Sequence, residues 1–120
     1  MRKFLLPAVA VAVLAGLWWW LKPVSGAPTE PQTRHYRLSF VDGQYQGPET
    51  LTAYQGDTVQ FDVFSDQDDA MHVHGYEKHL VLPSGATAAL RFTAENSGRF
   101  MLELHGSDLQ FGALEVYPRR

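Results

Sequence analysis

Hydrophobic residues are distributed in two different ways along the 120-residue chain. Near the N-terminus they form one run, from Phe4 to Leu21, which is interrupted only by Pro7 and Gly16. An unbroken apolar run of this length predicts an apolar helix. From residue 34 onward the hydrophobic residues instead occur in short segments, in which they alternate with polar residues.

The short alternating segments predict β-strands and an all-β domain. Val59, Phe61 and Val63 alternate with polar residues, which places them together on one buried face. Turns rich in Gly, Pro or Asn separate the segments at intervals of about ten residues, as in a β-sandwich or barrel. No helix is expected after residue 26. The predicted strands cover residues 35–41, 50–54, 58–64, 71–76, 80–82, 88–93, 99–105 and 112–117. The predicted interior consists of Phe61, Val63, Phe92, Phe100, Leu102, Leu114 and Val116.

The segments at the N-terminus follow the order of an export signal. Arg2 and Lys3 give a positive start, the apolar run follows, and small residues at 24–27 suit a leader peptidase. This order predicts a periplasmic or otherwise extracytoplasmic location for the β-domain, because the positive end stays in the cytoplasm.

Two fates of the leader remain open. Residues 1–26 are either a cleaved signal peptide or an uncleaved anchor in the inner membrane formed by residues 4–21. The 18-residue run is at the lower limit of a membrane span, whereas the tryptophans at 18–20 favour a membrane interface. In both cases residues 27–33, rich in Pro and Thr, form a spacer before a domain at 34–120.

The charge and the cysteine content limit which partners and which metal sites are expected for the β-domain. From Ala27 onward the chain has 7 basic and 13 acidic residues, a net charge of −6. Nucleic acids and anionic membrane surfaces bind clustered basic charge, so neither is an expected partner of the domain. The chain contains no cysteine, which excludes disulfides and thiolate-based metal sites.

Histidines supply the candidate chemistry. His72 and His74 are two residues apart on a predicted strand, and so are Glu103 and His105, so each pair leaves one face of the sheet. If the two strand ends meet, three imidazoles and a carboxylate converge, a donor set suited to Cu(II) or Zn(II). The competing interpretation is ordinary surface polarity. His79 is predicted to be a loop residue without a role in the site.

Several motifs resemble those of the cupredoxins. The similarity extends from about residue 50 to residue 118 and implies a cupredoxin-like Greek-key β-sandwich. It also implies that His72 is a copper ligand, as in the domains of cytochrome oxidase subunit II. The matching segments are Gly56-Asp57-Thr58-Val59, Asp69-Ala70-Met71-His72, Pro83-Ser84-Gly85 with Leu90-Arg91-Phe92, and Gly98-Arg99-Phe100.

The C-terminal segment resembles the ligand loop of plastocyanin-like proteins. His105 matches the family's second histidine ligand, and Gln110 matches the axial position, which is Gln in stellacyanin-like members. The position of the cysteine ligand is occupied by Leu102, or by Glu103 if the strand contains a bulge. The resemblance therefore implies a site at His72, His74, Glu103, His105 and Gln110 that lacks the thiolate of blue copper.

Three functions are compatible with these features. The first is an exported copper-binding protein that handles copper or delivers it to an exported copper protein, with zinc as the other candidate metal. The second is a metal-free accessory domain of a membrane or periplasmic complex. The third is a type 2 copper enzyme, although no substrate pocket or acid–base pair is evident. A cupin is a weaker alternative, because the spacing from His74 to Glu77 is one residue short.

Overall fold

The structure, a computed structural model, describes residues 5–22 and 30–119. Helix α1 spans Leu5–Leu21, as the apolar run predicts. The side chains of α1 that are described, from residue 8 onward, are exposed. Within the two described ranges, no helix has the length and apolar character needed to cross a membrane. The predicted peptidase site and residues 27–29 of the predicted spacer lie outside the described residues.

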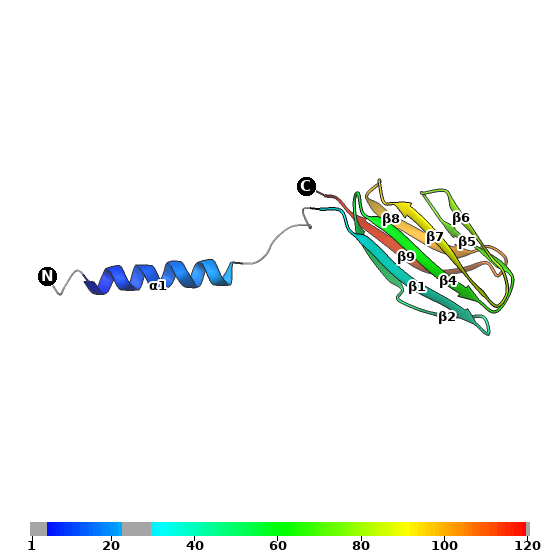
Figure 1. The fold of residues 1–120 in the computed structure, drawn as a ribbon, viewed down its shortest axis with the longest axis horizontal. Helices are drawn as coiled ribbons and strands as arrows, with labels where there is room; N and C mark the ends of the chain where they lie inside the picture. Colours follow the sequence, from blue (N-terminus) through cyan, green and yellow to red (C-terminus); the bar gives the residue numbers. More distant parts are fainter. Residues whose placement is uncertain (1–4, 23–29, 120) are drawn as a thin grey trace.

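The β-domain consists of two sheets (Figure 1). In the first sheet the strand order is β2-β1-β4-β7, and in the second it is β3-β9-β8-β5-β6. Strands β1 and β4 run parallel, as do β3 and β9, and the other pairs are antiparallel. The bounds are β1 Thr33–Val41, β2 Gln44–Gln46, β3 Thr50–Tyr54, β4 Thr58–Ser65, β5 Asp69–Val73, β6 Lys78–Leu82, β7 Ala86–Thr93, β8 Gly98–Leu104 and β9 Leu109–Tyr117.

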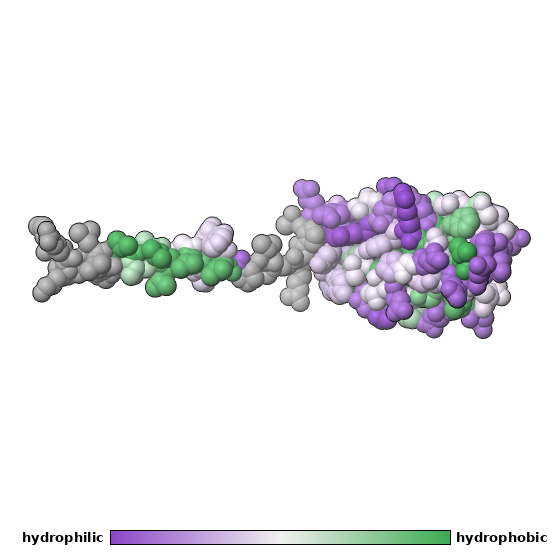
Figure 2. All heavy atoms as spheres, turned by 90° about the horizontal axis from the view of Figure 1, so that it is seen from below, coloured by the Kyte–Doolittle hydropathy of each residue, from purple (hydrophilic) through white to green (hydrophobic). Residues whose placement is uncertain are grey.

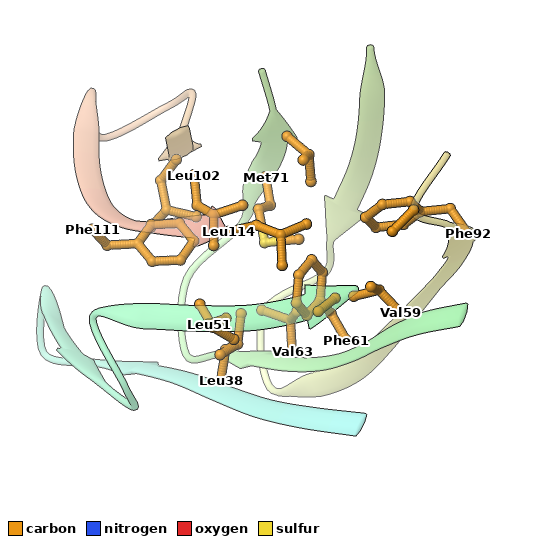
Figure 3. Packing of buried hydrophobic residues seen from close by; sticks show 14 of the residues in the cluster. Leu38, Leu51, Val59, Phe61, Val63, Met71, Phe92, Leu102, Phe111 and Leu114 are labelled. Atoms are coloured by element: carbon orange, nitrogen blue, oxygen red, sulfur yellow. The ribbon is translucent and has the colours of Figure 1, made fainter. Parts of the chain in front are cut away.

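The hydrophobic core lies between the two sheets. Figure 3 shows Phe61 and Val63 of one sheet directed toward Met71 and Leu114 of the other. Alternation along β4 leaves Val59, Phe61 and Val63 without solvent exposure, as predicted. The other predicted interior residues are also buried, apart from Phe100, which is half-buried against the core. The surface visible in Figure 2 is apolar along α1 and mostly hydrophilic over the β-domain.

Several strand predictions need correction. Strand β5 ends at Val73 rather than at Tyr76, and β8 ends at Leu104 rather than at His105, so His74 and His105 lie in the turns that follow these strands. Strand β2 was not predicted, because three residues between two turns carry too little pattern. Strand β6 begins at Lys78 rather than at Leu80, so His79 lies on a strand and not in a loop. The physical reason is backbone pairing across the hairpin, where His79 is the direct partner of His72 on β5.

Asp57, the residue just before β4, forms hydrogen bonds with residues from both the beginning and the end of the β-domain. This buried carboxylate accepts hydrogen bonds from the backbone N–H groups of Gln32 and Tyr54 and from the guanidinium groups of Arg34 and Arg119. Burial alone would raise the pKa of Asp57, but these donors outweigh it and lower the pKa below the ordinary value. The aspartate of the G-D-x-V motif thus links the beginning and the end of the domain to the start of the core strand β4.

Candidate metal centre

The candidate residues lie on the outer face of the five-stranded sheet. Met71 and Val73 are buried in the core, so His72 between them points to the opposite side. The same alternation turns Glu103 outward between Leu102 and Leu104. Strand pairing then sets up one row across four strands, in the order His79, His72, Glu103 and Gln110.

His72 is at the centre of a group of four imidazoles. The centre of its ring lies 4.3 Å from that of His79, 5.1 Å from that of His105 and 6.3 Å from that of His74. Its Nε2 atom is buried and has no hydrogen-bond partner within residues 5–22 and 30–119. A buried polar atom without a partner is rare and costs about 1–3 kcal/mol, so the position of Nε2 calls for an explanation.

The surroundings of His72 favour its neutral form. Loss of solvation is the main cause of a lowered pKa, and the nearby His79, His105 and His74 add to the effect. Glu103 acts in the opposite direction but does not cancel them. At neutral pH the ring is therefore uncharged, which is the form that binds metal ions.

His74 has a partner of its own. It follows the end of β5, and its backbone N–H donates to the carbonyl oxygen of Met101 at 3.0 Å. Its Nε2 lies 2.9 Å from a carboxylate oxygen of Glu103, with which it forms an ion pair when the ring is protonated. Both predicted donors are therefore in place on the outer face, and they contact each other.

Asp69 fixes the loop that carries His105. Its carboxylate accepts hydrogen bonds from the backbone N–H of Gly106 at 2.6 Å and from the hydroxyl of Ser107 at 2.9 Å. In addition, the N–H of His105 donates to the carbonyl oxygen of Ala70 at 2.8 Å. The conformation is compact, because a Cβ at Gly106 would lie only 2.9 Å from the Asp69 carboxylate. Asp69 thus holds the loop of one predicted ligand, His105, and lies three residues before another predicted ligand, His72.

Gln110 lies farther from the histidines. It pairs with Glu103, so one strand separates it from His72. A register shift between Leu102 and Glu103 makes Phe111 the extra residue, so the irregularity lies on β9 and not on the strand that carries Leu102 and Glu103. Leu102 is fully buried and faces the core, whereas Glu103 faces the histidines.

His79 was not among the predicted site residues. The available signal was the alternation of His79 and Val81 with the inward-facing Leu80 and Leu82. Its ring is the nearest of the three to that of His72. Cross-strand pairing, which cannot be read from the sequence, brings His79 next to His72.

The spacing of the rings fits metal coordination. A bound imidazole has its ring centre about 3.1 Å from the ion, so two rings lie about 4.4 Å apart at a right-angled site and about 5.1 Å at a tetrahedral one. The observed 4.3 Å and 5.1 Å agree with these values. As they stand, no three His, Asp or Glu side chains among the described residues enclose a position for an ion. Side-chain rotation would therefore accompany binding.

Comparison with solved structures shows the cupredoxin-like fold. A copper nitrite reductase from Nitrosomonas europaea matches 72% of this chain with a TM-score of 0.56 and 20% identity, and 42% of its own chain is covered. A copper-binding protein solved by NMR in the apo form matches 78% of this chain and 99% of its own, with a TM-score of 0.59 and 18% identity.

A multi-copper oxidase from Pseudomonas thermotolerans gives a TM-score of 0.61 at 21% identity, over 76% of this chain and 31% of its own. The chain therefore spans less than half of the reductase and of the oxidase. No protein-family model and no curated protein sequence matches it. The β-domain is thus a sandwich of the kind found in copper proteins.

Proposed function

We propose that this protein binds copper at the histidine cluster on the outer face of the five-stranded sheet and handles the ion as a cargo. The observation that carries the proposal is the buried, unpartnered Nε2 of His72 amid three other imidazoles. His72 and His105 are the two positions at which the cupredoxin pattern also has ligands. Imidazole donors suit Cu(II), which stands at the top of the divalent affinity series.

The side chains define what kind of centre this would be. The chain supplies no thiolate, so bound copper would have nitrogen and oxygen donors and a type 2 character. His72 supplies a neutral ring, Asp69 holds the loop of His105, and the Glu103 carboxylate adds negative charge beside the rings. The side chains of His74 and His79 are exposed on this face, so an ion can be exchanged with a partner. These features support storage or delivery rather than electron transfer.

Copper titration with electron paramagnetic resonance tests the proposal. The full chain, kept in solution with a mild detergent, is titrated with Cu(II) beside His72→Ala and His105→Ala. His35→Ala is the matched control, because that ring lies on the other sheet and pairs with Asp62. We expect one type 2 signal per chain with nitrogen couplings that only the first two variants weaken. Loose binding that is the same in all four proteins would contradict the proposal and favour a metal-free accessory domain.

We also propose that the β-domain works outside the cytoplasm, where the partner would be another exported copper protein. The support is the order of the basic start, the apolar run and the small residues at 24–27. Fusions of alkaline phosphatase and of a fluorescent protein to the C-terminus test this in a bacterial host. Export predicts an active phosphatase and a dark fluorescent protein, and the reverse result would refute it. Mass spectrometry of the N-terminus separates a cleaved leader from an anchor.

A further inference from the structure

We propose that the third imidazole of the copper site, beside His72 and His105, is His79 of strand β6 and not His74. This assignment rests on the proposed copper-binding function and makes it specific. The cupredoxin pattern contains no counterpart of His79. The assignment rests on cross-strand geometry, on the partners of the two imidazoles and on the place of β6 in the sheet.

The first argument is the distance between the rings. His72 and His79 are direct cross-strand partners on antiparallel strands, with ring centres 4.3 Å apart. Side chains in such a pair leave the same face of the sheet with their Cβ atoms about 5 Å apart. Two imidazoles in this arrangement can therefore chelate one ion without any change in the backbone. His74, at 6.3 Å from His72, is the most distant of the three rings.

The second argument concerns the interaction partners that His74 and His79 have before an ion binds. The Nε2 of His74 already lies 2.9 Å from the Glu103 carboxylate, so binding through this atom would require the pair to separate. Among the described residues, the imidazole of His79 forms no hydrogen bond or ion pair. Coordination by His79 thus costs only side-chain ordering, whereas coordination by His74 also costs a hydrogen bond.

The third argument is the place of β6 in the sheet. Strand β6 is at the edge of the sheet, next to β5. An ion held by His72 and His79 would link this edge strand to its neighbour and protect it from local opening. Metal binding through His74 would not do so, because His74 follows β5 and its N–H is bonded to β8. The two assignments therefore predict different effects on β6.

The two histidines form a matched pair for mutagenesis, since both rings lie on the same face. Cu(II) affinity is measured by competition with a chromophoric chelator for the full chain and for the variants His79→Ala, His79→Gln, His74→Ala and His72→Ala. Circular dichroism of the metal-free proteins checks that each variant is folded. Hydrogen exchange of the amides of β6, with and without Zn(II), adds a readout independent of copper.

Loss of a ligand should lower the affinity at least as much as loss of a ligand's hydrogen-bond partner, which costs about 10–100-fold. We expect a decrease of about 100-fold for both His79 variants and for His72→Ala, and of less than about tenfold for His74→Ala. Zn(II) should slow amide exchange in β6. Normal affinity in both His79 variants, together with loss in His72→Ala, would overturn the assignment and leave the copper site intact. If the parent chain itself bound no copper, the proposed function would fail, and the assignment with it.

Discussion

Replacement of Asp69 by alanine tests how the second ligand loop is held. The substitution removes the carboxylate that accepts the N–H of Gly106, the hydroxyl of Ser107 and the N–H of Ala70. Asp69 is the first residue of β5, and the other residues of β5 and all residues of β8 are unchanged. We therefore expect the fold to persist while the loop around His105 becomes free to adopt other conformations.

The size of the effect follows from these hydrogen bonds. A net contribution of about 1 kcal/mol for each of the two bonds that reach the loop gives about 2 kcal/mol in total. If this free energy holds the loop in its binding conformation, its loss lowers the apparent Cu(II) affinity by up to about 30-fold. The melting temperature of the domain should fall by about 8–16 °C, if the loop remains part of the cooperative unit.

Asp68→Ala is the control for this experiment. Asp68 also fastens a loop, through the N–H of Ser84 at 2.8 Å, but it does not contact the histidine loop. Calorimetry and chelator competition are performed on both variants. A loss of affinity in Asp69→Ala that Asp68→Ala does not share would support the reasoning. Equal affinities in the parent and in Asp69→Ala would refute the role of Asp69 in positioning His105.

The same carboxylate predicts a pH dependence. Burial alone would raise the pKa of Asp69, but hydrogen bonds from Ala70, Gly106 and Ser107 outweigh it and lower the pKa. Because the pKa is lower in the folded state, the stabilising contribution is present above the ordinary value of about 4 and is lost as the pH falls through the lowered pKa. Urea unfolding of the parent and of Asp69→Ala should therefore differ at pH 7 and converge in acid. A constant difference down to low pH would contradict this.

Three further predictions concern the scaffold. Asp57→Ala should lower the free energy of unfolding by about 4 kcal/mol, because it leaves two guanidinium groups and two backbone amides without their acceptor. Gly75→Ala should cost about 2–4 kcal/mol, since Gly75 has φ +86° and a Cβ would lie 2.5 Å from the Phe100 ring. Tyr76→Phe should cost about 1 kcal/mol through loss of its hydrogen bonds to the backbone of Asn96. Urea denaturation measures all three changes.

Two controls sharpen these measurements. Asp62→Ala removes a half-buried carboxylate and should destabilise the domain much less than Asp57→Ala, so equal losses in the two variants would contradict the importance of burial. Gly85→Ala has a positive φ of +77° but meets no atom within 4 Å, so it isolates backbone strain from the steric clash. If it were as destabilising as Gly75→Ala, the contact with Phe100 would not matter.

Local patterns predicted most of the β-domain. Alternation in β4 identifies its buried face, because a strand between a core and solvent needs one apolar side. The predicted strand at 50–54 coincides with β3, and the turns around Gly43, Gly56 and Gly85 have the positive φ values that glycine tolerates. The short strand β2 and the start of β6 were not predicted, since both depend on hairpin pairing with the preceding strand, which the pattern of residues does not display.

The candidate site was predictable only in part. The period of two in His72-x-His74 and Glu103-x-His105 is a local property that predicts one face for each pair, whereas in the structure His74 and His105 lie in the turns just after β5 and β8. The ion pair between His74 and Glu103 depends on the pairing of β5 with β8, and the proximity of His79 to His72 depends on the register of β5 with β6. A shift by one residue would turn either side chain into the core.

The sequence by itself determined that the chain has an apolar N-terminal helix followed by a β-sandwich, that its histidines gather near two strand ends, and that no thiolate is present. These properties follow from composition and from the periods of helix and strand, which act over a few residues. Only the tertiary structure decided which imidazoles lie together, how Asp69 holds the loop of His105, and that the Nε2 of His72 is left without a partner. These contacts join residues from different strands, 7 positions apart for His72 and His79 and 37 for Asp69 and Gly106, and the register of the folded sheet sets them.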